Sequence, residues 1–141
     1  MKPLYMILDE VAAAKGPKAK KAKLLENDCL YLRDFLRFSF DDSIVSLLPE
    51  GCPPFDEAEI DEYDAGRINK VTKELAYFCE GGPGQRMMAP KREKKWVAIL
   101  ETLNPEDAAL YNLMKDKMMD GAYNGLTKKL VKDAFPGLIR K

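Results

Sequence analysis

Residues 28–38, DCLYLRDFLRF, form the most aromatic segment of the chain. Asp28 is a residue type that is typical of a helix N-cap. The apolar side chains that follow recur at intervals that place them on one side of a helix, where they would be buried: Leu30, Leu32, Phe35, Leu36 and Phe38. The segment therefore predicts a helix that packs into a hydrophobic core.

Helical spacing continues on both sides of this segment, and proline, glycine and capping residues mark the ends of the helices. We expect helices at 4–14, 17–27, 68–80, 90–103, 105–118 and 126–135, and a short helical turn at 44–48. In the helix after Pro17, we expect a buried side and a lysine side in water, the buried side being made of Ala19, Ala22, Leu24 and Leu25. No alternating strand pattern of useful length occurs. The sequence predicts an all-α fold, a single compact bundle of about six to seven short helices that spans 1–141.

Length and composition fit one domain, since 141 residues with 46% hydrophobic content can bury one core. No apolar run approaches the roughly 20 residues that span a bilayer, and no signal-peptide pattern opens the chain. The three cysteines are widely spaced, and the chain has no histidine. Free thiols fit a reducing compartment. We therefore expect a cytoplasmic protein without a membrane partner.

Charge is unevenly distributed along a chain whose net charge is zero. Residues 15–23 contain five lysines and no acid, and residues 41–64 contain nine acids and no base. Most of the acids fall in 49–65, a stretch with several prolines that predicts a long irregular loop between two helical halves. Lysine density returns near the C-terminus.

Signatures of catalysis are missing from the sequence. Without histidine the commonest general base is absent, and no serine or cysteine has a recognisable activating partner. The glycines at 81–84 lack the ending of a phosphate-binding P-loop, and the acids at 56–64 lack calcium-loop spacing. We expect a non-catalytic protein with no cofactor, no metal and no small-molecule substrate.

Several short segments, in their order along the chain, carry a family resemblance. They are Ile7–Val11, Leu24–Glu26, Leu32–Leu36, Ala109–Lys117, Asp120–Ala122, Leu126–Ala134 and Phe135–Ile139. This order resembles the N-terminal all-helical DNA-binding domain of viral and phage ATP-dependent DNA ligases. The catalytic domains of those ligases have no counterpart here, so ligation is not implied. The chain also resembles small uncharacterised proteins of tailed phages.

The ligase resemblance implies contact with the phosphates of double-stranded DNA, mainly along the minor groove. Glycine turns and helix starts expose backbone N–H groups that can receive phosphate, and lysines add charge. The DNA-binding candidates are Lys18, Lys20, Lys21, Lys23, Gly121, Asn124, Gly125, Thr127, Lys128 and Lys129. No helix presents arginine, asparagine or glutamine to base edges in a recognisable way, so we expect sequence-independent binding.

The main hypothesis is thus a DNA-binding accessory protein, phage-encoded and acting in the cytoplasm of the infected host cell. An alternative is a protein-interaction module that contacts a host or phage protein through the acidic segment 41–64, in the manner of a nucleic-acid mimic. A virion structural component is a further alternative. The lysine helices also fit ordinary solvated helix faces, and Thr127 fits an ordinary N-cap.

Overall fold

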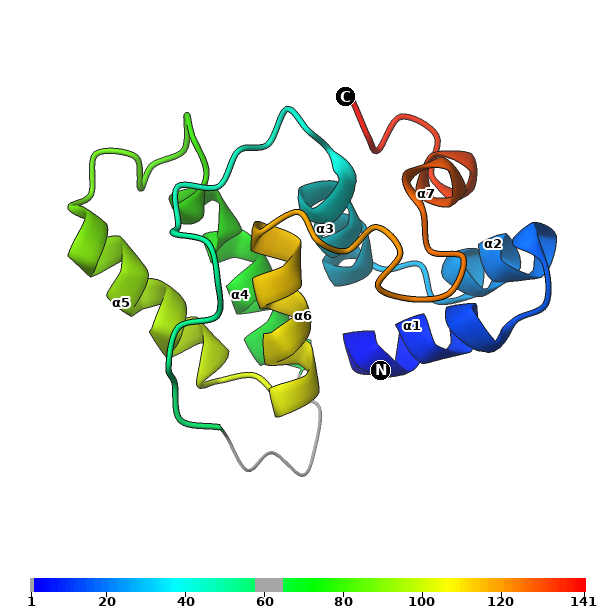
Figure 1. The fold of residues 1–141 in the computed structure, drawn as a ribbon, viewed down its shortest axis with the longest axis horizontal. Coiled ribbons are helices and arrows are strands. Elements are labelled where there is room, and N and C mark those ends of the chain that lie inside the picture. Colours follow the sequence, from blue (N-terminus) through cyan, green and yellow to red (C-terminus); the bar gives the residue numbers. More distant parts are fainter. Residues whose placement is uncertain (1, 58–64) are drawn as a thin grey trace.

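The computed structural model describes residues 2–57 and 65–141, which form seven α-helices and one 3-10 helix with no sheet (Figure 1). The elements are α1 (Leu4–Ala13), α2 (Pro17–Glu26), α3 (Leu30–Phe40), α4 (Ala65–Glu74), η1 (Leu75–Phe78), α5 (Ala89–Leu100), α6 (Pro105–Lys115) and α7 (Lys128–Ala134). The prediction of a compact all-α bundle of six to seven short helices is confirmed.

The helices are arranged along one long axis (Figure 1). Helices α1, α2 and α7 form one end, α5 forms the other, and α3, α4 and α6 lie between them. Helix α6 packs on α1 and α3, and α7 packs on α2. Helices from both sides of the 49–65 segment therefore share one core.

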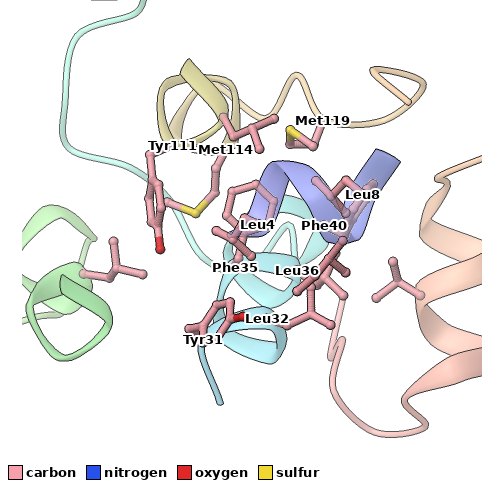
Figure 2. Close-up of a cluster of buried hydrophobic side chains, with 14 of the residues drawn as sticks. Leu4, Leu8, Tyr31, Leu32, Phe35, Leu36, Phe40, Tyr111, Met114 and Met119 are labelled. Atoms are coloured by element: carbon pink, nitrogen blue, oxygen red, sulfur yellow. The ribbon is translucent and has the colours of Figure 1, made fainter. Parts of the chain in front are cut away.

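The core is built around α3, as its sequence predicts. Leu32, Phe35 and Leu36 are fully buried, and Figure 2 shows them in one cluster with Leu4 and Leu8 of α1 and with Tyr111 and Met114 of α6. The Phe35 and Tyr111 rings meet edge to face with 5.5 Å between centroids, an arrangement that aromatic quadrupoles favour. The ring centroid of Trp96 in α5 lies 6.5 Å from that of Tyr111, which extends the aromatic cluster toward the α5 end of the molecule.

Asp107 joins the start of α6 to the start of α1. Its backbone N–H donates to the Asn104 side chain at 2.8 Å, so the predicted N-cap at Asn104 is confirmed. Its fully buried carboxylate accepts from the backbone N–H of Leu4 at 3.2 Å and of Tyr5 at 2.9 Å. Because the first N–H groups of a helix have no partner within it, this carboxylate acts as a cap supplied from more than 100 residues away.

The start of α3 differs from the prediction. Cys29 rather than Asp28 holds the N-cap position, and Leu30 is 59% exposed instead of buried. Asp28 is bonded elsewhere, since its carboxylate accepts from Arg33 at 2.6 Å and 2.8 Å. The first turn of α3 thus projects beyond the core, and the buried face begins at Tyr31.

The buried side of α2 was also predicted wrongly. Leu24 is buried as expected, but Ala22 and Leu25 are exposed, and Lys20 is buried in their place. The face of α2 that packs against α1 and α7 includes Lys20, because its ammonium donates hydrogen bonds to backbone oxygens of α1.

The segment 44–48 is extended rather than helical. Ser46 pairs with Cys79 in an isolated antiparallel bridge, in which Leu47 N–H donates to Phe78 O at 2.7 Å and Glu80 N–H donates to Val45 O at 2.9 Å. The backbone groups of Val45 and Leu47 therefore find their partners across the chain and not within a helical turn. The described part of the predicted loop, 49–57, is irregular as expected.

Helix α6 is shorter than predicted, ending at Lys115 and not near Met118. Lys117 adopts a left-handed backbone with φ 57°, which breaks the helix. The Lys117 ammonium donates to the backbone oxygen of Phe38 in the last turn of α3. It also donates, at 3.0 Å, to the backbone oxygen of Asp41, the residue just after α3. Lys117 therefore ends its own helix, α6, and its side chain caps the C-terminal end of α3.

Candidate nucleic-acid interface

Two lysine-rich segments that are far apart in the sequence lie side by side, because α2 packs against α7 (Figure 1). The approach is close: a Cβ on Gly125, just before α7, would lie 2.6 Å from Cε of Lys20 on α2. Lys18 and Lys21 of α2 and Lys129 of α7 are exposed. We call the exposed basic side chains of α2, α7 and the C-terminal residues the α2–α7 surface.

Lys20 does not belong to that surface. The residue is only 7% exposed, and its ammonium donates to the backbone oxygens of Val11 at 3.0 Å and Ala12 at 2.9 Å. The last carbonyls of a helix have no partner within it, and a cation at that end also interacts favourably with the helix dipole. Lys20 therefore closes the end of α1 and is removed from the DNA-binding candidates.

Two other predicted lysines are engaged in ion pairs. Lys128 lies 3.0 Å from the Asp42 carboxylate and also donates to the backbone oxygen of Lys141. Lys23 lies 3.4 Å from Glu26 on the same helix. These pairs are partly exposed, so they contribute little to stability, but they lower the net positive charge that the two lysines offer a ligand.

Lys132 and Arg140 are exposed cations that the prediction missed. Lys132 follows Lys128 by one helical turn, and that spacing was the available signal. Arg140 comes to this end because its backbone N–H donates to the Asp41 carboxylate at 3.0 Å, a contact across 99 positions that no local pattern reveals.

The predicted glycine turn before α7 serves the backbone first. Gly121 and Gly125 have φ of 79° and 76°, backbone values that residues other than glycine rarely adopt. Thr127 is the N-cap of α7, with its hydroxyl oxygen accepting from Leu130 N–H at 3.2 Å. Asn124 and Thr127 are exposed, so this turn borders the α2–α7 surface.

The first acids of the 41–64 segment are part of the fold. Asp41 is 1% exposed, and its carboxylate accepts from the Ser43 N–H at 2.9 Å, the Ser43 hydroxyl at 2.6 Å and the Arg140 N–H. Burial alone would raise the pKa of Asp41, but these hydrogen bonds lower it to about 2. Asp41 and Asp42 therefore lie beside the lysines of α7. The last acids, Glu59, Asp61, Glu62 and Asp64, lie outside the described residues.

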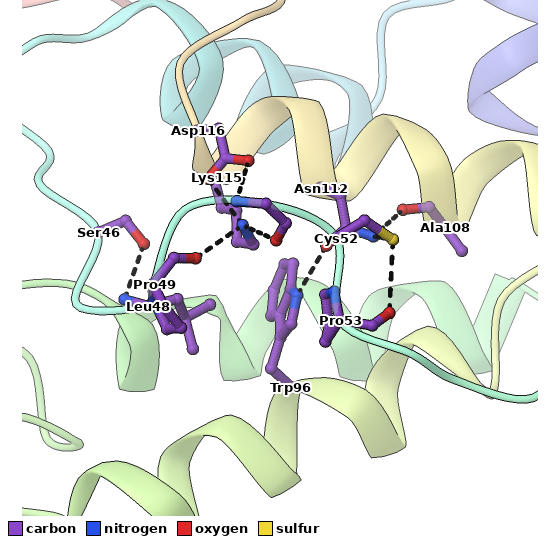
Figure 3. A network of polar contacts seen from close by, with 11 residues as sticks. Ser46, Leu48, Pro49, Cys52, Pro53, Trp96, Ala108, Asn112, Lys115 and Asp116 are labelled. Carbon is purple, nitrogen blue, oxygen red and sulfur yellow. Dashed lines mark hydrogen bonds and ion pairs between the residues drawn. The ribbon is translucent and has the colours of Figure 1, made fainter.

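The loop that follows is fixed to α6 by a polar network (Figure 3). The buried Lys115 ammonium donates to the backbone oxygens of Pro49 at 3.1 Å and Gly51 at 2.8 Å, and pairs with Asp116 at 2.7 Å. Asp116 in turn accepts from the Gly51 N–H at 3.0 Å. A cavity of about 150 Å³ beside Trp96 is lined by this loop and Lys115. The Lys115 ammonium at its wall is already bonded to the loop, which indicates a structural role for this side chain.

The described residues, 2–57 and 65–141, contain neither a candidate metal centre nor a membrane-spanning helix. Among them, no group of three or more cysteine, aspartate or glutamate side chains is placed to hold a metal ion. None of the helices in the described ranges is long and apolar enough to cross a membrane.

A family model supplies the relationship of this chain to other proteins. No curated protein and no solved structure matches the chain. The model of a family of unknown function, DUF6433, matches residues 7–121. That range includes the lysines of α2 and Gly121, and it ends before Asn124, Gly125 and α7. Because the match covers far more than half of the chain, the protein belongs to the DUF6433 family.

Proposed function

We propose that this protein is a non-catalytic accessory protein that binds double-stranded DNA without sequence preference through the α2–α7 surface. The observation that carries the proposal is the packing of α2 against α7, which gathers lysines from two distant segments at one end of the molecule. The resemblance to the ligase DNA-binding domain favours the same partner. By the same resemblance, we propose that the protein is phage-encoded and acts in the cytoplasm of the infected host cell.

The chemistry of the surface suits a phosphate backbone. Its exposed cations are Lys18, Lys21, Lys129, Lys132, Arg140 and Lys141. Duplex DNA carries one phosphate charge per about 1.7 Å of its axis, and each phosphate that a protein neutralises releases bound counterions. An array of separate lysine charges can meet such a backbone in many registers, whereas base recognition requires planar groups in fixed positions. The surface therefore supports affinity without sequence preference.

The test is the salt dependence of binding to a labelled duplex, measured by fluorescence anisotropy. The informative variant is Lys129→Glu/Lys132→Glu, because both side chains are exposed, whereas replacing Lys128 would also break its pair with Asp42. The matched control is Lys91→Glu/Lys94→Glu on α5, which makes the same change in net charge at the other end of the molecule.

We expect the wild-type affinity to fall steeply with salt, and the α7 variant to lose affinity with a log–log slope that is shallower by about 2. The α5 control should bind the single duplex nearly as the wild type does. Equal losses in both variants would mean that binding of the duplex is not specific to the α2–α7 surface, which contradicts the proposal. Absence of wild-type binding at about 50 mM salt would refute the proposal.

A further inference from the structure

A second group of exposed cations lies away from the α2–α7 surface, on α4 in the middle of the long axis and on or just before α5 at its other end (Figure 1). Lys70 and Lys73 belong to α4, Lys91 and Lys94 belong to α5, and Arg86 precedes α5. All five are exposed. We call them the α4–α5 surface. They come from parts of the chain that are separate from α2 and α7. None of them is among the DNA-binding candidates that the sequence predicted.

Two contacts of Lys95 tie the helices of this surface together. Its ammonium lies 3.7 Å from the Glu74 carboxylate at the end of α4 and 4.9 Å from the centroid of the Tyr77 ring in η1. Lys91 is one turn before Lys95 on α5, and Lys70 is one turn before Glu74 on α4. The Lys95–Glu74 pair therefore joins α5 to the end of α4, and Lys91 and Lys70 each lie one helical turn from this pair.

The segment that carries Arg86 is also held in place. The side chain of Arg92, which is 9% exposed, donates to the backbone oxygens of Gly84 at 3.2 Å and Met87 at 2.9 Å. Gly84 itself is buried against Tyr77, because a Cβ at this position would lie 2.0 Å from the Tyr77 carbonyl oxygen. Arg86 thus projects from a turn that is packed on the same helices as the lysines.

Among residues 70–100 of the described chain, the exposed cations outnumber the exposed acids. Glu74 is used by Lys95, and Glu93 is half-buried, while Glu80 is exposed. Four of the five exposed cations are lysines distributed over two helices. Such separate point charges suit the repeating phosphates of a nucleic-acid backbone better than one defined acidic group.

We infer that the α4–α5 surface binds a second DNA duplex, so that one protein molecule bridges two duplex segments. The inference rests on the proposed function of the α2–α7 surface. Because α5 lies at the end of the molecule opposite α2 and α7, a duplex bound at the α2–α7 surface leaves the cations of α5 open.

The experiment measures bridging directly. One duplex is immobilised on beads, and a second, fluorescent duplex is captured from solution through the protein. The variants are Lys91→Glu/Lys94→Glu and Lys70→Glu/Lys73→Glu, which carry the same charge change on α5 and α4. Circular dichroism melting verifies that each variant is folded, and anisotropy at low DNA concentration measures binding of a single duplex.

We expect the wild type to capture the second duplex, and both variants to lose most of this capture while they still bind one duplex. Lys129→Glu/Lys132→Glu should lose binding of the first duplex. Wild-type protein that binds one duplex but captures none would overturn bridging and leave the proposed function standing. Capture that survives in both α4–α5 variants would also overturn it, and would assign bridging to self-association. Failure to bind any duplex would refute the proposed function itself.

Discussion

Replacing Lys20 with methionine removes the ammonium group and keeps most of the length of the side chain. In the wild type this ammonium donates to the carbonyls of Val11 and Ala12 at the end of α1. A hydrogen bond from a charged donor contributes about 1.5–3 kcal/mol, and the interaction of a cation with a helix C-terminus adds about 0.3–1 kcal/mol. Part of that sum is offset, because the wild type must remove the ammonium from water.

We therefore expect Lys20→Met to lower the free energy of unfolding by about 2 kcal/mol. For a chain of this size that loss corresponds to a decrease in Tm of about 6 °C. The matched control is Lys21→Met, because the neighbouring side chain is exposed. Exposed substitutions of this kind usually change stability by less than about 0.5 kcal/mol.

The assay is urea unfolding followed by the fluorescence of Trp96, the only tryptophan of the chain, which is 2% exposed. DNA binding provides the second readout. Lys20→Met should leave the salt slope of binding unchanged below its Tm, whereas Lys21→Met should make the slope shallower by about 1. If the two variants were equally stable, the structural role of Lys20 would be refuted. A slope that changes only in Lys20→Met would refute its exclusion from the surface.

Three further changes test other parts of the structure. Asp41→Asn should lower the free energy of unfolding by about 2 kcal/mol at pH 7, because the folded pKa of about 2 is below the ordinary value for this carboxyl, 3.8. The stability difference from wild type should be complete above about pH 5 and disappear as pH falls through about 2, which urea titrations at several pH values would show. Gly84→Ala should destabilise by about 1–3 kcal/mol or more, because the new Cβ meets the Tyr77 carbonyl; thermal melting that matches wild type would contradict this packing. Asn112→Ala should cost about 1–3 kcal/mol in the same melting assay, because the Trp96 indole N–H donates to the Asn112 amide oxygen at 3.1 Å and would be left buried without it.

The sequence predicts those parts of the fold in which local signals and burial agree. Proline and asparagine at the start of α6, and the spacing of Leu32, Phe35 and Leu36 in α3, give the right helices on the right faces. The segment 44–48 was missed because its partner, 78–80, lies about 30 residues later in the chain. The local composition of 44–48 fits a helical turn as well as an extended segment, so it does not distinguish the two.

Basic residues were harder to interpret than apolar ones. Composition treats every lysine and arginine as a surface charge, yet Lys20, Arg92, Lys115 and Lys117 bind backbone carbonyls within the fold. Each of them satisfies an oxygen from a different segment, so only tertiary structure reveals the role. The same long-range packing brought Arg140 to the candidate surface, where the sequence had given no reason to expect it.

The cap that Asp107 places on α1 has a consequence for how the molecule is assembled during synthesis. Helix α1 is made first, but the carboxylate that satisfies its first N–H groups arrives with residue 107. Lys20 likewise packs against a turn at Gly125, and α7 follows still later. The α2–α7 surface is therefore completed last. A nascent or shortened chain without α7 carries the lysines of α2 but lacks the rest of that surface.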